Sequence, residues 1–205
     1  MQLIGMLDSP YVRRVAVSLH VLGQPFAHQP LSVFSTFEQF QQINPVVKAP
    51  TLVADDGTVL MDSTLILQWI ESQAPGPRLT PANPAQRLHD LRLTGLALAA
   101  CEKSVQIVYE HNVRPAEKLH APWLERVTGQ MRTAYGLLEA ELAGRPPQLD
   151  EAGLTAAVVW FFSQQMHPEL LPAAAHPNLT ALSAWAEARP EFRAAPHGEG
   201  VYPVA

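Results

Sequence analysis

The chain has 205 residues, of which 47% are hydrophobic and 16% charged, with 14 Lys+Arg against 19 Asp+Glu and a net charge of -5. These values are typical of a globular protein with a sizeable core, and they argue against a disordered chain and against nucleic acid as a partner. The single cysteine, Cys101, excludes an internal disulfide framework and suits a cytoplasmic location. No apolar run approaches the roughly 18 residues of a membrane span, so we expect no membrane partner and no signal segment.

The first part of the chain alternates short apolar runs with amphipathic ones, which is typical of an α/β unit. The pattern predicts strands over residues 2–6, 25–31, 51–53 and 59–61, a helix from Pro10 to Gly23, a short helix over 35–42, and a helix around Leu65–Ile70. Ser9 is the expected N-cap of the first helix, Pro10 its first residue and Gly23 its stop.

The second part of the chain shows no strand signal. Residues 74–84 hold four prolines and one glycine, so we expect a first domain over residues 1–75, a linker over 76–84 and an all-α domain over 85–205. Predicted helices cover 85–111, a stretch from Trp123 to Leu142, 154–166 and 179–188. The helix over 154–166 is nearly uncharged, which predicts that it lies at the centre of the all-α domain.

Several kinds of chemistry lack their sequence signal. The eight histidines are scattered, no two of them three to five residues apart, so no metal site is predicted. No P-loop is present, which leaves nucleotide binding without support. A hydrolase is only a background possibility, because the chain has no G-x-S-x-G elbow.

The run from Asn44 to Leu52 places a proline directly before a strand. If the Ala49–Pro50 peptide is cis, Ala49 presents its N–H and C=O outward, where a cysteine-containing peptide can pair with them as an added strand. The alternative is an ordinary turn proline, because only about 5–6% of X–Pro bonds in folded proteins are cis.

Ser9, Asp62 and Ser63 lie at predicted helix starts, where unpaired backbone N–H groups attract carboxylates. Each of the three is also explained by simple helix capping. No single one of these residues therefore identifies a ligand.

Taken together, three segments resemble the cytosolic glutathione S-transferases, in particular the bacterial, serine-type members. These segments are residues 9–15 (SPYVRRV), 44–52 (NPVVKAPTL) and 62–66 (DSTLI), and they occur in the family's order and spacing. The resemblance covers nearly the whole chain. It implies a thioredoxin-like N-terminal domain that binds glutathione, an all-α C-terminal domain that completes a pocket for an electrophile, and a homodimer.

The resemblance assigns a role to each matching residue. Ser9 corresponds to the hydroxyl that hydrogen-bonds the glutathione sulfur, Pro50 to the cis-proline, and Ala49 to the residue whose main chain pairs with the cysteinyl part. Asp62 and Ser63 correspond to the pair that holds the γ-glutamyl end. Lys48 is the expected partner of the glycine carboxylate. Glutathione is a co-substrate in this scheme, and no cofactor is expected.

The acid–base chemistry of a thiol explains how such a site would make glutathione more reactive. A free thiol has a pKa near 8.5, and only the thiolate is a good nucleophile. Lowering the pKa by one unit takes about 1.36 kcal/mol of preferential thiolate stabilisation. A hydrogen bond from Ser9 and the positive end of the first helix together supply roughly 1–3 kcal/mol. No general base is then needed.

Other residues receive weaker assignments. Candidates for the electrophile pocket are Tyr11, Phe34, Tyr109 and His111. Arg13 and Arg14 are expected as surface or interface charges, whereas Cys101, Trp123, Phe161 and Phe162 are expected in the core. Many family members open the buried helix of the second domain with a Ser/Thr-x-x-Asp box. Residues 155–158 read Thr-Ala-Ala-Val, so Val158 replaces the acid and Thr155 remains as the expected cap.

The sequence thus favours a homodimeric glutathione transferase that conjugates small hydrophobic electrophiles in detoxification. Two alternatives stay open. One is a non-catalytic glutathione-binding or protein-interaction module of the same fold, and the other is a glutathione-dependent isomerase or dehalogenase. Fold analogy does not separate them, because activity depends on the site.

Overall fold

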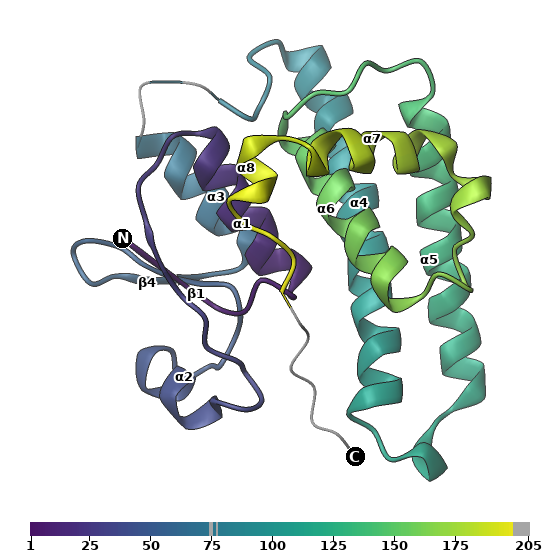
Figure 1. Ribbon diagram of the computed structural model, residues 1–205, viewed down its shortest axis with the longest axis horizontal. Coiled ribbons are helices and arrows are strands. Elements are labelled where there is room, and N and C mark those ends of the chain that lie inside the picture. Colours follow the sequence, from purple (N-terminus) through teal and green to yellow (C-terminus); the bar gives the residue numbers. More distant parts are fainter. Residues whose placement is uncertain (74–75, 77, 199–205) are drawn as a thin grey trace. The chain divides into compact units, whose positions relative to one another are not determined.

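The computed structural model describes residues 1–73, 76 and 78–198 (Figure 1). The described residues group into two compact units, one formed by Met1–Leu79 with residues 189–198 and the other by Thr80–Ala188. The segment 189–198 thus groups with the first unit, although the sequence had assigned it to the all-α domain. The expected boundary at residue 75 lies outside the described residues, and the expected linker 76–84 ends where Pro84 begins a helix.

The first unit is an α/β layer structure, as predicted. Its elements are β1 (Gln2–Ile4), α1 (Pro10–Val21), β2 (Ala27–Gln29), α2 (Phe37–Ile43), β3 (Thr51–Val53), β4 (Val59–Met61), α3 (Ser63–Gln73) and α8 (Pro190–Arg193). The strand order is β2-β1-β3-β4, in which β1 and β2 are parallel and the other pairs are antiparallel. Only the short helix α8 has no counterpart in the sequence prediction.

Helix α1 is the central helix of this unit. Its N-cap is Ser9, Pro10 is its first residue, and Gly23 follows it in a left-handed conformation with φ of 64°. Figure 1 shows α1 and α3 side by side, and the two helices are in contact. Val15 and Leu19 of α1 and Ile66 of α3 are fully buried. This burial of apolar side chains is the main source of the unit's stability.

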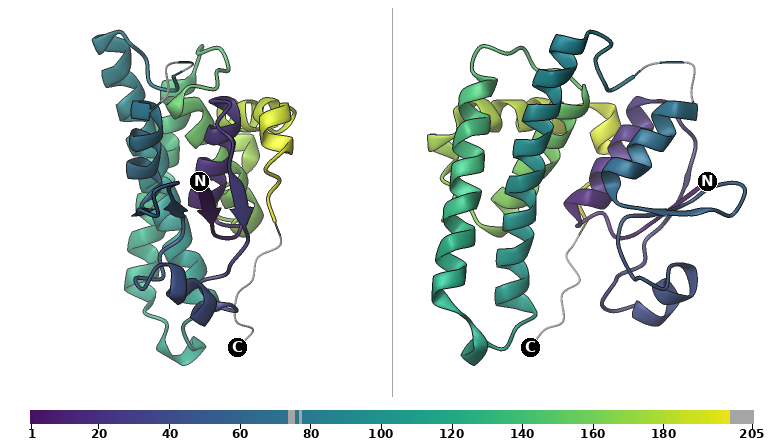
Figure 2. Two further views of the ribbon diagram at one scale, coloured as in Figure 1. Left: turned by 90° about the vertical axis from the view of Figure 1, so that its left-hand side faces the viewer. Right: turned by 180° about the vertical axis from the view of Figure 1, so that it is seen from behind.

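The second unit contains helices only. Its elements are α4 (Pro84–Asn112), η1 (Ala116–Lys118), α5 (Ala121–Leu142), α6 (Glu151–Met166), η2 (Ala173–Ala175) and α7 (Pro177–Glu187). Figure 2 shows α4 and α5 as long neighbouring helices, and α6 packs against both α4 and α7. Residues 151–160 are all buried, which confirms the prediction that this helix lies at the centre of the domain.

The start of α6 differs from the prediction. The helix begins at Glu151 rather than Leu154, and its N-cap is Asp150, whose Oδ1 accepts a hydrogen bond from the Gly153 N–H at 2.9 Å. Thr155 is therefore a fully buried residue inside the helix and not its N-cap. The sequence at Thr155 resembles a helix start, but an aspartate five residues earlier already supplies the cap.

Of the four residues expected in the core of the second unit, Cys101 and Phe162 are buried, Phe161 is only half-buried and Trp123 is exposed. Cys101 is fully buried and Phe162 is 2% exposed, as expected. Trp123 is 39% exposed, because it lies in the first turn of α5 on a solvent-facing side. Within the described residues, no helix combines the length and the apolarity that crossing a bilayer requires.

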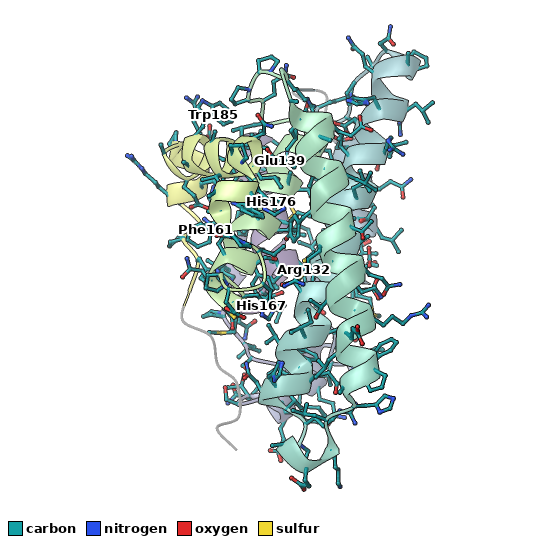
Figure 3. The ribbon with its side chains drawn as sticks, turned by 90° about the vertical axis from the view of Figure 1, so that its right-hand side faces the viewer. Arg132, Glu139, Phe161, His167, His176 and Trp185 are labelled. Carbon is teal, nitrogen blue, oxygen red and sulfur yellow. The ribbon has the colours of Figure 1, made fainter. Side chains whose placement is uncertain are left out.

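A buried polar chain runs through the core of the second unit. The Tyr135 hydroxyl is 2.6 Å from Ser163 Oγ, and the Ser163 hydroxyl donates to Ser104 Oγ at 3.0 Å. His167, at the end of α6 (Figure 3), places Nε2 3.0 Å from the Ser104 carbonyl oxygen. Burial lowers the pKa of His167 and raises that of Tyr135. Both side chains are thus kept neutral, as buried hydrogen-bonded groups usually are.

Candidate functional site

The sheet register brings the three segments together at one end of the sheet. Ile4 pairs with Thr51, and Thr51 pairs with Met61. Pro50 directly precedes Thr51 and Asp62 directly follows Met61, so both lie next to the end of β1, from which the chain leads to Ser9. The sequence segments around Ser9, Pro50 and Asp62 therefore line the same end of the first unit.

Gly5 lies in close contact with two of these segments, the one that contains Ser9 and the one that contains Pro50. Its φ is 137°, and a Cβ at this position would lie 2.6 Å from Val12 Cγ2 and 3.3 Å from the Ala49 Cβ. Only glycine fits both the backbone conformation and the space. The first turn of α1 and Ala49 are thus packed against the same residue at the end of β1.

Ser9 caps α1 with its side-chain oxygen. The Val12 N–H donates to Ser9 Oγ at 3.4 Å, and the Arg13 N–H donates to the Ser9 carbonyl oxygen at 2.9 Å. Because Oγ acts only as an acceptor here, the hydroxyl proton has no acceptor within the described part of the chain. Capping and donation to a ligand are compatible, since they use different parts of the hydroxyl group.

The Ala49–Pro50 peptide is cis, so the condition that the sequence prediction set for Ala49 is met. The loop before it is fixed by Asn44, which is 1% exposed and donates from Nδ2 to Thr51 Oγ1 at 2.8 Å. The Thr51 hydroxyl in turn donates to the Lys48 carbonyl oxygen at 2.7 Å. Among the described residues, nothing pairs with the N–H or the C=O of Ala49.

Asp62 caps α3 from a left-handed backbone conformation with φ of 73°. Its Oδ1 accepts from the Thr64 N–H at 2.9 Å and from the Leu65 N–H at 3.4 Å. Its Oδ2 has no partner within residues 1–73, 76 and 78–198. One carboxylate oxygen is therefore used for capping and the other remains available to a ligand.

Ser63 is tied to α1 by a buried arginine. Arg14 is fully buried, and its Nη1 donates to Ser63 Oγ at 2.9 Å and to Thr64 Oγ1 at 3.0 Å. Arg13 is 1% exposed and its Nε donates to the Ala195 carbonyl oxygen at 2.9 Å. The expectation that Arg13 and Arg14 are surface or interface charges is therefore wrong, because each has polar partners on distant segments.

The remaining candidate residues are dispersed. Lys48 is exposed, and Tyr11 and Phe34 are half-buried, all in the first unit. Tyr109 and His111 are exposed residues of α4. Tyr109 lines an open pocket of about 670 Å³ with Val113 and Trp123, whereas His111 is not among the described residues that line it. No group of three or more potential metal ligands occurs in the described part of the chain.

Sequence reasoning missed Gly5, Arg14 and the bracing role of Asn44. Arg14 lies on a helix in which nine of the twelve residues are buried, which leaves no room for a full polar face. An arginine on such a helix must find polar partners inside the protein. Nothing in the sequence indicates which partners these are.

Comparison with known proteins agrees with this geometry. Residues 3–78 match the family model of the glutathione S-transferase N-terminal domain. A glutathione transferase family member from Pseudomonas fluorescens Pf-5, solved with bound glutathione, is 32% identical, has a TM-score of 0.86, and is aligned over 97% of this chain and 99% of that one. The chain belongs to the glutathione transferase family.

Two further relatives are similar at lower identity. The GST-like protein YibF of Escherichia coli K12 is 26% identical over 159 residues, which are 78% of each chain. A maleylacetoacetate isomerase of Mus musculus is 27% identical over 117 residues, 52% of this chain and 54% of that protein.

Proposed function

We propose that the protein is a glutathione transferase and that its glutathione site lies at one end of the sheet. The residues that form this site are Ser9, Ala49, Pro50, Asp62 and Ser63. The single observation that carries this proposal is the strand register, which gathers these segments at one end of the first unit. The glutathione-bound relative from Pseudomonas fluorescens supports the choice of ligand.

The unused polar groups of the site match the functional groups of glutathione. Asp62 Oδ2 is suited to the ammonium of the γ-glutamyl end. The Ser63 hydroxyl, which accepts from Arg14 but keeps its own proton, is suited to the adjacent carboxylate. The N–H and C=O of Ala49 are suited to the main chain of the cysteinyl residue, as in strand addition. Lys48 is exposed and is suited to the glycine carboxylate.

Ser9 supplies the chemistry in this proposal. Its free hydroxyl proton donates to the sulfur, and a hydrogen bond that is stronger to the thiolate than to the thiol lowers the thiol pKa. The N-terminus of α1 adds a favourable partial positive charge. The thiolate then attacks a small hydrophobic electrophile and forms a thioether, while the leaving group or the activated double bond of the electrophile accepts the electron pair.

A glutathione-dependent isomerase is the second candidate, and the maleylacetoacetate isomerase relative favours it. An isomerase adds the thiolate to a double bond and later releases it, so glutathione is not consumed. A non-catalytic module would bind glutathione without either reaction.

Calorimetric titration with glutathione, followed by two assays, tests the proposal. We expect the wild-type protein to bind glutathione and to consume it in the presence of electrophiles such as nitroaryl halides and enones. Isomerisation of maleylacetoacetate without loss of glutathione would favour the second candidate. Binding with neither reaction would indicate the non-catalytic module, and the absence of binding in a folded protein would overturn the assignment of the site.

A further inference from the structure

Apart from the pocket beside Tyr109 of the second unit, the first unit carries a cavity with a volume of about 370 Å³. Its walls include His20 from the last turn of α1 and His28 from β2. Gln24 and Phe26, from the segment between these two elements, and Leu7, from the loop between β1 and α1, complete them. The volume is within the range of pockets that hold small molecules. None of these residues belongs to the proposed glutathione site.

The lining of this cavity, which is open to solvent at the exposed residues Pro25 and His28, favours uncharged ligands. Among the described residues that line it, none is an aspartate, glutamate, lysine or arginine. Bringing an ionised group into a site without a counter-charge is unfavourable. Glutathione itself carries two carboxylates and an ammonium, for which this lining offers no counter-charge.

The orientation of His28 determines one polar feature of the cavity. Its Nε2 is 2.8 Å from the Gly5 carbonyl oxygen, which can only accept a hydrogen bond. Nε2 therefore carries the proton, and in the neutral ring Nδ1 is left as an acceptor. Nothing among the described residues donates to this Nδ1. A ligand that satisfies it must bring a hydrogen-bond donor.

The apolar part of the cavity includes an aromatic pair. The rings of His20 and Phe26 have centroids 5.1 Å apart and an interplanar angle of 59°. Such tilted pairs offer both a face and an edge to a third ring. Leu7 and Ala195 add aliphatic surface.

From these features we infer that the cavity binds a neutral aromatic molecule that carries a hydrogen-bond donor, such as a phenol, with its O–H directed to His28 Nδ1. The site is separate from the glutathione site, although Leu7 lies two residues before Ser9. The protein thus binds a phenol and glutathione at the same time.

A matched set of probes tests the ligand class. Fluorescence titration with 2-naphthol is compared with 2-methoxynaphthalene, which lacks the donor, and with 2-naphthoate, which is an anion. We expect 2-naphthol to bind about tenfold more tightly than the ether, because one hydrogen bond is worth up to about 1.4 kcal/mol. Equal binding of the ether, or tighter binding of the naphthoate, would overturn the inference.

Variants test the location. His28→Gln keeps a donor near the position of Nε2 for the Gly5 carbonyl but lacks the Nδ1 acceptor, so we expect about tenfold weaker binding of 2-naphthol. Phe26→Leu removes the aromatic wall and weakens binding independently. His120→Gln, at an exposed histidine of the second unit, serves as the control and should bind like wild type. Unchanged affinity in both cavity variants would contradict the location.

Competition separates this site from the glutathione site. S-hexyl glutathione, which occupies both the proposed glutathione site and the adjoining electrophile position, should leave 2-naphthol bound. Displacement of 2-naphthol would overturn the inference. Glutathione titrations of the same variants should match wild type, so a failure of the phenol site is distinguishable from a failure of the glutathione site.

Discussion

At the scale of single residues, Asp62 combines two functions in one carboxylate. Its Oδ1 accepts two backbone N–H groups at the start of α3, and its Oδ2 is the proposed partner of the glutathione ammonium. Asp56 makes one comparable hydrogen bond, since its Oδ1 accepts from the Thr58 N–H at 2.9 Å, but it lies on an exposed turn and caps no helix. The two aspartates therefore form a matched pair for mutagenesis.

We expect Asp62→Asn to weaken glutathione binding by about tenfold or more, because a charge-assisted hydrogen bond to the ammonium becomes a neutral one. Asp56→Asn makes the equivalent change away from the site and should leave the affinity unchanged. Calorimetric titration of both variants measures the effect. Equal affinities of the two variants would exclude Asp62 as a ligand residue.

Asp90 is a buried carboxylate at a junction of the second unit. It is 2% exposed. Its Oδ1 accepts a hydrogen bond from the Ala152 N–H at 3.2 Å and lies 3.8 Å from Arg145 Nη2. Its Oδ2 has no partner in the described part of the chain. Burial, with the nearby Asp150 carboxylate, raises the pKa of Asp90 to about 6. The folded protein therefore holds the Asp90 proton to a higher pH than the unfolded chain does.

This shift predicts an unusual pH dependence. Because the pKa is about 6 in the folded state and 3.8 in the unfolded state, the contribution of Asp90 to stability is lost as the pH rises from about 4 to 6 and returns on acidification. Asp90→Asn stays neutral, so we expect it to be more stable than wild type above pH 6 by roughly 1–3 kcal/mol.

Urea unfolding at a series of pH values checks this prediction. The stability difference between Asp90→Asn and wild type should shrink as the pH approaches 4. A constant difference across the series would show that the carboxyl group does not titrate as described.

At the scale of elements, α7 receives its N-terminal cap from another helix. Its own N-cap residue, His176, makes no side-chain cap hydrogen bond. Instead Glu139 of α5 accepts from the Asn178 N–H at 2.8 Å and the Leu179 N–H at 2.9 Å. Figure 3 shows Glu139 and His176 on neighbouring segments. A negative charge also interacts favourably with this end of the helix.

We expect Glu139→Ala to lower the free energy of unfolding by about 1–2 kcal/mol, because two N–H groups lose their acceptor. The control is Glu141→Ala, which removes a surface ion pair with Arg92 at 2.9 Å and should cost no more than about 0.5 kcal/mol. Denaturant unfolding of both variants provides the comparison. Similar costs for the two would argue against the role of Glu139 as a cap.

Elements whose signals are local were predicted well from the sequence. Ser9, Pro10 and Gly23 define the ends of α1 through their own conformational preferences, and β3 and β4 have the predicted bounds because a turn and alternating apolar residues specify them. The start of α6 was misplaced because a threonine and an aspartate both suit an N-cap, and tertiary contacts decide between them. The Ala152 N–H at the start of α6, for example, donates to Asp90 Oδ1 of α4 at 3.2 Å.

Parts of the candidate site were also predicted, because their signals are local in sequence. Its backbone features follow from local sequence and from the family resemblance, and the cis peptide before Pro50 is present. The buried arginines were not predicted, because Arg14 meets Ser63 and Arg13 meets Ala195 only after the chain has folded. Contacts between residues so far apart in sequence leave no local pattern.

At the scale of the whole molecule, exposed apolar side chains support the proposed homodimer. Leu88 and Leu91, on one side of α4, are 72% and 50% exposed, and Leu65 of α3 is 58% exposed. Residues three apart on a helix lie on the same face, so Leu88 and Leu91 form one apolar patch. Covering such a patch with a second copy of the chain is favourable.

We expect the wild-type protein to sediment as a dimer and the double variant Leu88→Lys, Leu91→Lys to sediment as a monomer, because charges replace the apolar contact. Leu137→Lys changes another exposed leucine, which is 45% exposed on α5, and should remain dimeric. Sedimentation velocity distinguishes the two species. A wild-type monomer, or a dimer that survives the double substitution, would contradict this interface.

The most direct test of the central claim is the pKa of the glutathione thiol when it is bound to the protein, followed through the ultraviolet absorbance of the thiolate. We predict a pKa below that of free glutathione for the wild-type protein and for Ser9→Thr, which keeps the hydroxyl. Ser9→Ala should raise the bound pKa by about one unit, the equivalent of one hydrogen bond. The same bound pKa in wild type and Ser9→Ala, with glutathione bound to both, would contradict the role of Ser9.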